Sequence, residues 1–223
     1  MIEINEIFSD SDKRIAVWCN GAEDTSDLAV LADNIVENQI SLISVPADSL
    51  LFLWTCLEKT GVKMLTRYVF EGGNRDIDND VSVMSENIVT MQRQGASGVQ
   101  IFIKKRDFEH VIDLLSTIRD DLFFEHDLCI FLNIQEIGVD EWTAIFNKLR
   151  EIRADSFGLL FNEDMGNRSD FIGRIYGMLD NWNFDGDLQF VFGNNFDRMD
   201  QVVRLVESMR PELSNKLHFF LEY

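Results

Sequence analysis

The feature that most constrains the fold is a series of eight short apolar runs, rich in β-branched and aromatic residues. Each run except the last is followed by an amphipathic stretch with helical periodicity. Their spacing fits one strand plus one crossover helix, repeated along the whole chain. The runs cover residues 14–20, 40–46, 63–70, 98–104, 128–135, 156–162, 188–194 and 217–223.

Eight such units in 223 residues predict an α/β fold, a closed (β/α)8 TIM barrel of parallel strands in which the last helix is missing or replaced. The alternative is an open doubly wound sheet, because strand order is not written in the pattern. No Pro/Ser-rich linker or break in composition divides the chain. We therefore expect a single domain over residues 1–223, with residues 1–12 as an N-terminal segment that can pack on the barrel.

The charge and the cysteine content of the chain limit the classes of partner and the location that we expect. The formal net charge of −19 repels nucleic-acid phosphates and anionic lipids, so we expect neither nucleic acid nor a membrane as partner. Residues 1–12 carry acids where a signal peptide needs a basic region and then an apolar run. The three cysteines are widely separated and form no CxxC pair, which favours a reducing, cytoplasmic location.

Side-chain parity indicates which residues face the barrel interior, because alternate side chains of a barrel strand face the helices and the interior. In the fourth run, Ile101 and Ile103 belong to an apolar outer row, which turns Gln100 and Lys104 inward. The fifth run turns Asn133 inward in the same way. Functional groups of such barrels lie where the strands end, so polar inward residues near those ends are the candidates for a site that binds a small-molecule ligand.

The candidates divide into two groups. The catalytic candidates are Lys104, Glu222 and Arg67, and the substrate-binding candidates are Asn20, Ser44, Gln100, Asn133, Asn162 and Asn195. An arginine in mid-strand requires a buried partner such as Glu222 or Glu71, or an anionic ligand. For Asn133 and Asn162 the alternative is a cap on the strand backbone. For Lys104 it is a solvated loop.

Several common chemistries lack their motifs. The three histidines do not cluster, so we expect no histidine-based metal site, although carboxylates at the barrel mouth leave magnesium open. The patterns GxSxG, GxxxxGK[ST] and GxGxxG are absent, which argues against serine hydrolases and nucleotide-phosphate binding. We expect no cofactor.

Residues 43–104 carry a family resemblance. The stretches ISVPADSLLFLWTCLEKTGVKMLTRYVFEGG and ENIVTMQRQGASGVQIFIK resemble the second to fourth strands of deoxyribose-phosphate-aldolase-type class I aldolase barrels. That resemblance implies chemistry through a Schiff base on a strand-six lysine. Here Gly158 stands about where the lysine would be, and Gln100 stands where that family has a strand-four acid. The resemblance thus implies an aldolase-like barrel without its nucleophile.

Two functions follow from these residues. One is a lyase or isomerase that acts on a small polar or anionic metabolite without a Schiff-base lysine. The other is a catalytically silent barrel that serves as a binding or assembly subunit. A mouth filled with Phe and Trp side chains would favour the silent barrel.

No helix follows the last run, so the outer row of this strand needs another cover. Leu217, Phe219 and Leu221 would each forgo roughly 1.5–3 kcal/mol if left in water. Either residues 1–12 or a second subunit could cover them. We favour the subunit, and therefore a homodimer, because a short acidic segment covers less area than a helix.

Overall fold

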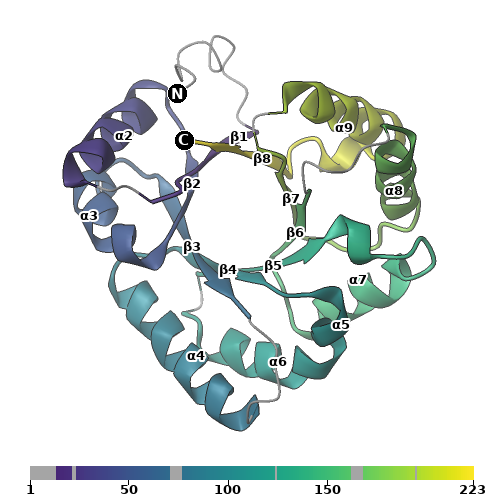
Figure 1. The fold of residues 1–223 in the computed structure, drawn as a ribbon, viewed down its shortest axis with the longest axis horizontal. Coiled ribbons are helices and arrows are strands. Elements are labelled where there is room, and N and C mark those ends of the chain that lie inside the picture. Colours follow the sequence, from purple (N-terminus) through teal and green to yellow (C-terminus); the bar gives the residue numbers. More distant parts are fainter. Residues whose placement is uncertain (1–13, 22–23, 71–76, 124, 162–167, 194) are drawn as a thin grey trace.

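The computed structural model describes residues 14–21, 24–70, 77–123, 125–161, 168–193 and 195–223, apart from the side chains of residues 77–82 and 168. Its eight strands follow one another around a closed barrel in sequence order, from β1 to β8. All neighbouring strands are parallel, and β1 closes the barrel against β8 with Ile15 opposite Phe219. The predicted (β/α)8 barrel is confirmed, and the open doubly wound sheet is excluded (Figure 1).

The elements have the following bounds. The strands are β1 (Ile15–Trp18), β2 (Leu42–Val45), β3 (Lys63–Val69), β4 (Gly98–Phe102), β5 (Asp127–Asn133), β6 (Ser156–Leu160), β7 (Asp187–Val191) and β8 (Leu217–Glu222). The α-helices are α2 (Thr25–Glu37), α3 (Ala47–Leu57), α4 (Ile77–Arg93), α5 (Lys105–Phe108), α6 (Ile112–Asp121), α7 (Trp142–Glu151), α8 (Arg168–Asp180) and α9 (Phe196–Met209). Short 3-10 turns are η1 (Glu109–Val111), η2 (Ile134–Glu136) and η3 (Pro211–Leu213).

The strands present the two faces that parity predicts. Ile101, Ile130 and Leu132 are buried in a large cluster that they share with helix residues such as Leu115 and Phe146. A separate cluster fills the barrel interior and consists of Ala16, Leu42, Leu65, Cys129, Phe131, Val191 and Phe220. Alternation along each strand therefore separates an outer core from an inner one.

The outer row of β8 is buried, as the sequence-based expectation of a cover requires. Leu217 and Phe219 are each 1% exposed and Leu221 is 4% exposed. The first two share a buried cluster with Val202 and Val206 of α9. Side chains of α9 thus belong to the core that includes Leu217 and Phe219, whereas residues 1–12, the other expected cover, lie outside the described residues. The homodimer stays a prediction.

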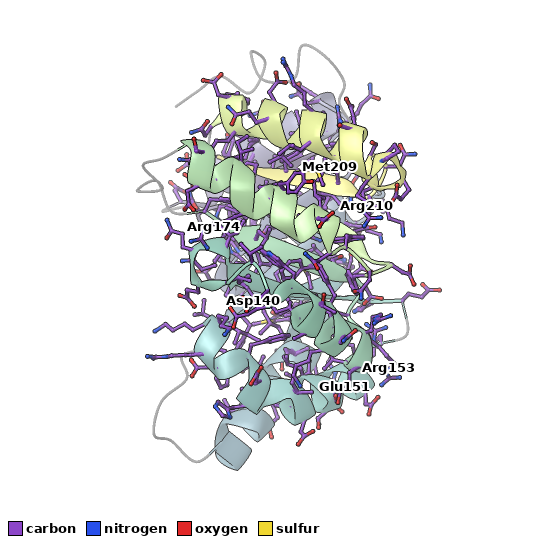
Figure 2. All side chains as sticks on the ribbon, turned by 90° about the vertical axis from the view of Figure 1, so that its right-hand side faces the viewer. Asp140, Glu151, Arg153, Arg174, Met209 and Arg210 are labelled. Atoms are coloured by element: carbon purple, nitrogen blue, oxygen red, sulfur yellow. The ribbon has the colours of Figure 1, made fainter. Side chains whose placement is uncertain are left out.

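Two arginines hold α8 in the outer layer (Figure 2). Arg174 donates through Nη1 to the carbonyls of Ile134 at 3.1 Å and Ile137 at 2.9 Å, in the segment that follows β5. Arg210 donates through Nε to the carbonyl of Leu179 at 2.9 Å, near the end of α8. Both arginines donate to backbone carbonyls at turns or helix ends, and so anchor α8 to its neighbours.

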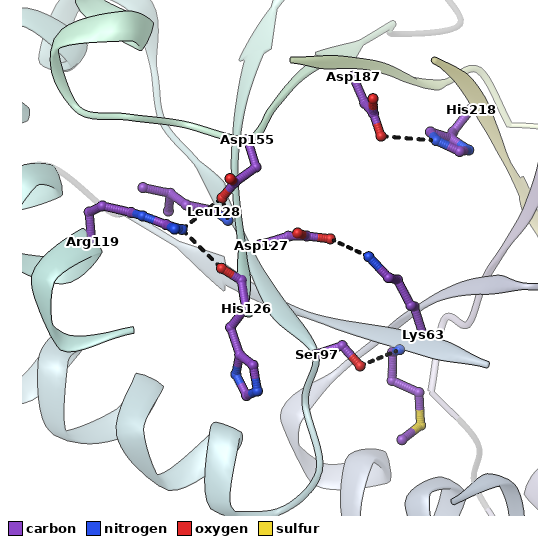
Figure 3. Close-up of polar contacts among 10 residues, drawn as sticks. Lys63, Ser97, Arg119, His126, Asp127, Leu128, Asp155, Asp187 and His218 are labelled. Atoms are coloured by element: carbon purple, nitrogen blue, oxygen red, sulfur yellow. Dashed lines mark hydrogen bonds and ion pairs between the residues drawn. The ribbon is translucent and has the colours of Figure 1, made fainter. Parts of the chain in front are cut away.

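Ion pairs gather where the strands begin. Lys63 Nζ lies 3.3 Å from Asp127 Oδ2, and His218 Nε2 lies 3.4 Å from Asp187 Oδ2 (Figure 3). By strand register these side chains share the inward parity of Leu65, Cys129 and Phe220. They close the amino-terminal end of the barrel with partly exposed pairs.

A second network at this end joins α6 to two strands. Arg119 Nη1 donates to Asp155 Oδ2 at 2.7 Å and to the carbonyl of His126 at 2.9 Å (Figure 3). Asp155 Oδ2 also accepts a hydrogen bond from the backbone N–H of Leu128 at 2.8 Å. These contacts tie helix to sheet at the end of a barrel that usually serves stability.

The covered face of β8 makes a prediction about stability. Replacing Phe219 with Ala removes a buried ring, so we expect a loss of about 3–5 kcal/mol in the free energy of unfolding. Chemical denaturation measures this loss. A change below about 1 kcal/mol, typical of exposed positions, would show that the outer row of β8 is not buried.

Candidate functional site at the carboxyl-terminal mouth

Aromatic side chains fill the barrel interior below the ends of the strands. Trp18 contacts Phe102 edge to face, with ring centroids 5.7 Å apart, and contacts Phe220 at 6.1 Å. The ring of Phe102 stacks on that of Phe131 at 4.7 Å. These four rings come from β1, β4, β5 and β8 and meet inside the barrel. Geometries of this kind add attraction beyond the burial of apolar area.

The ring of Phe131 occupies the position at which the aldolase resemblance implies a lysine. A Cβ built on Gly158 would stand 2.4 Å from three carbons of this ring. Gly158 lies directly opposite Phe131 in the register of β6 and β5. Because Phe131 also stacks on Phe102, the ring has little room to withdraw. No side chain larger than hydrogen fits at residue 158 while Phe131 keeps this position.

Ser44 and Gln100 lie within a buried polar chain across the interior. Ser44 Oγ donates to Gln100 Oε1 at 2.6 Å, and Gln100 Nε2 donates to Gln189 Oε1 at 3.0 Å. Ser44 and Gln100 have no exposed surface, and Gln189 is 2% exposed. These contacts satisfy amide and hydroxyl groups that would otherwise be costly to bury. The two candidates thus bond to protein groups inside the barrel.

Arg67 lies at the mouth and is held by two neighbours. Its Nη2 donates to the carbonyl of Cys19, and its guanidinium lies over the Trp18 ring, 4.1 Å from the centroid. These contacts stand where the sequence suggested a carboxylate, although Glu71 lies outside the described residues. Arg67 Nη1 is buried and has no hydrogen-bond partner in the described part of the chain.

Burial governs the electrostatics of Arg67. Desolvation lowers the pKa of its guanidinium to about 10, while the charges of Cys19 and Asp48 act in the opposite direction. Burial also raises the pKa of the Cys19 thiol, against the effects of the Gly21 backbone N–H and of Arg67. Arg67 is therefore a desolvated cation with a donor still to satisfy, and an anion would stabilise its charged form.

Two of the candidate asparagines are caps. Asn133 Oδ1 accepts from the N–H of Gln135 at 2.9 Å at the start of η2, and Asn195 Oδ1 accepts from the N–H of Arg198 at 3.1 Å at the start of α9. Such caps satisfy donors that helical turns leave free. Asn20 follows β1 with an exposed side chain, and Asn162 lies outside the described residues.

Lys104 and Glu222 lie at the ends of their strands. Lys104 is exposed and immediately precedes α5, for which it is the N-cap residue without a side-chain cap. Glu222 ends β8 opposite Trp18 in the strand register and is also exposed. The structure therefore brings Arg67 into contact with Trp18, and Ser44 into contact with Gln100. Asn133 and Asn195 instead form separate local caps.

The described residues contain no group of three or more His, Cys, Asp or Glu side chains arranged to hold a metal ion. Within the same residues, no helix has the length and apolar character needed to cross a membrane.

Sequence reasoning missed two features of this site, the cover of Phe131 over Gly158 and the contact of Trp18 with Arg67. A glycine at an inward strand position is a signal for close approach of another group. The glycine alone does not reveal which ring fills the space.

Comparison with known proteins gives a fold. No family model matches the sequence, and no curated protein matches it. A putative deoxyribose-phosphate aldolase from Coccidioides immitis has a TM-score of 0.69 and 15% identity, over 94% of this chain and 80% of that one. The tetrameric deoxyribose phosphate aldolase from Aeropyrum pernix has a TM-score of 0.70 and 13% identity, over 97% and 87% of the two chains.

A putative copper homeostasis protein CutC from Streptococcus agalactiae is also similar, with a TM-score of 0.64 and 14% identity, over 93% of this chain and 97% of that one. Identities this low show a shared fold and leave activity open. The resemblance to deoxyribose-phosphate-aldolase-type barrels therefore holds at the level of the fold. The chain is a TIM barrel whose fold is similar to that of these aldolases.

The contact between Gly158 and Phe131 can be tested by stability. We expect Gly158→Ala to lower the free energy of unfolding by about 1–3 kcal/mol, because the added methyl overpacks the interior. In a Phe131→Ala background the same change should cost little. Chemical denaturation of the two single variants and the double variant measures this coupling.

Gly173 provides the matched control, because a Cβ there meets nothing within 4 Å. On α8, Gly173→Ala should stabilise the protein by about 0.5–1 kcal/mol. An equal cost of Gly158→Ala with and without the Phe131 ring would contradict the steric explanation.

Proposed function

We propose that this protein is a ligand-binding barrel that has the aldolase-like architecture, performs no Schiff-base chemistry and takes a small anionic metabolite as its ligand. The observation that carries the proposal is the ring of Phe131, which lies against Gly158 and leaves no space for a nucleophile. The four aromatic rings below the mouth support it, because they fill the volume in which a substrate would react. Arg67 supports an anionic ligand because its Nη1 is buried without a partner.

We place this role in the cytoplasm. The three cysteines are free thiols, two of them buried, as is usual for proteins of a reducing compartment.

A lyase or isomerase that needs no Schiff base is the second candidate. It is favoured by the exposed side chains of Lys104 and Glu222, which follow β4 and end β8 at the mouth. In this case Glu222 would move a proton, while Arg67 and Lys104 would neutralise the charge of the substrate.

A ligand survey separates these functions. Thermal unfolding of the protein is measured in the presence of small carboxylates, small phosphates and neutral polyols. In a separate incubation with the folded protein, each compound is analysed by NMR for product. We expect at least one anion to raise the midpoint temperature of unfolding. At a ligand concentration a hundredfold above Kd, the stabilisation should be about 2.7 kcal/mol. We also expect the ligand to be recovered unchanged. Turnover that is lost in Glu222→Gln would establish the enzyme, and a flat response to every anion would refute binding.

Borohydride trapping tests the absence of Schiff-base chemistry directly. Incubation with simple aldehydes or ketones followed by borohydride should add no mass to Lys104, since its exposed side chain lies beyond the end of β4 and outside the barrel interior in which a Schiff-base lysine reacts. Peptide mass spectrometry locates any label. Borohydride-dependent modification of Lys104 would restore a covalent mechanism and overturn this part of the proposal.

A further inference from the structure

We infer that the part of the mouth formed by Trp18, Arg67, Val69 and Phe102 binds the carboxylate of a small monoanion with an apolar body. This inference rests on the proposed function and adds to it the place and the chemical class of the ligand. The four residues come from β1, β3 and β4. They combine one incompletely bonded cation with apolar side chains near the ends of neighbouring strands.

The position of the cation is fixed before any ligand arrives. Nη2 is engaged by the Cys19 carbonyl and the face of the guanidinium is engaged by Trp18, which leaves Nη1 buried and unpartnered. A buried donor without a partner costs about 1–3 kcal/mol, more when it is charged. A ligand oxygen at Nη1 would recover this energy through a charge-assisted hydrogen bond. Because Nη1 is buried without a ligand, the side chains that cover it must move aside when a ligand binds, while the contacts of Nη2 and of the guanidinium face can stay in place.

The surroundings of Arg67 are apolar. Val69 shares its parity on β3 and is 63% exposed. In the strand register Val69 pairs with Phe102, whose ring is partly exposed and contacts Trp18. Exposed apolar groups beside a single polar anchor are typical of sites for ligands with an apolar body.

The charge balance favours a carboxylate over a phosphate. Nη1 is the buried guanidinium nitrogen without a partner, and a phosphate dianion needs more donors than this to offset its desolvation. Asp48 in the first turn of α3 adds a negative charge that is felt at Arg67. The whole chain carries a net charge of −19, which opposes a dianion more than a monoanion.

Calorimetric titration with three probes tests the inference. The probes are benzoate, its neutral analogue benzamide and the dianion phenyl phosphate. We expect benzoate to bind at least about tenfold more tightly than benzamide, because only benzoate accepts a charge-assisted hydrogen bond. Phenyl phosphate should bind no more tightly than benzoate. Tighter binding of phenyl phosphate would overturn the choice of carboxylate.

Variants assign the binding to the site. Arg67→Gln should weaken benzoate by about tenfold and leave benzamide unchanged. Val69→Asp places a carboxylate beside Arg67 at an exposed position, so it should block benzoate even if Arg67→Gln does not fold. Asp48→Asn should strengthen benzoate by about two- to fivefold, since it removes a nearby negative charge. Lys59→Gln is the control for loss of one positive charge, because its side chain is 90% exposed beyond the end of α3.

The outcomes distinguish the inference from the proposed function. Benzoate binding that is unchanged in Arg67→Gln and Val69→Asp refutes this site, while a barrel that binds small anions elsewhere remains. No difference between benzoate and benzamide also refutes it. The survey of other anions then decides whether the barrel binds any ligand.

Discussion

The pairing of β1 with β8 is the constraint on which the rest of the structure depends. This parallel contact, with Ile15 opposite Phe219 and Trp18 opposite Glu222, turns an open sheet into a closed barrel. Closure removes the sheet edges and encloses a fixed volume. Only every second residue of each strand contributes to that volume, so a few side chains decide whether the interior is a core or a reaction chamber.

In this chain those side chains divide the interior into layers. Ion pairs such as that between Lys63 and Asp127 occupy the end where the strands begin. The hydrogen-bonded chain through Gln100 lies farther along, and aromatic rings lie near the mouth. Arg67 stands at the border of the aromatic layer, where burial makes its charge costly. Packing and electrostatics are thus set by the same few positions.

The sequence predicted the fold because the fold is periodic. All eight strands were found from the repetition of short apolar runs, and the outward direction of Ile101 and Ile130 followed from parity. The part that α9 takes in the core around Leu217 and Phe219 was not predicted, because it depends on three-dimensional packing. The partners of Arg67 were missed for a similar reason, since a backbone carbonyl leaves no trace in a sequence pattern. Side-chain identity suggested candidates, and rotamers and register decided their contacts.

The fit of Phe131 against Gly158 limits the order in which these two residues can be substituted. A descendant that gained a lysine at residue 158 would first meet the ring, and one that lost the ring would first carry a void. Whichever of residues 158 and 131 changes first, the single variant is less stable, so the two changes are tolerated best together. Any path from this sequence to a lysine at residue 158 therefore passes through a less stable protein, even though the backbone resembles that of the aldolase barrels.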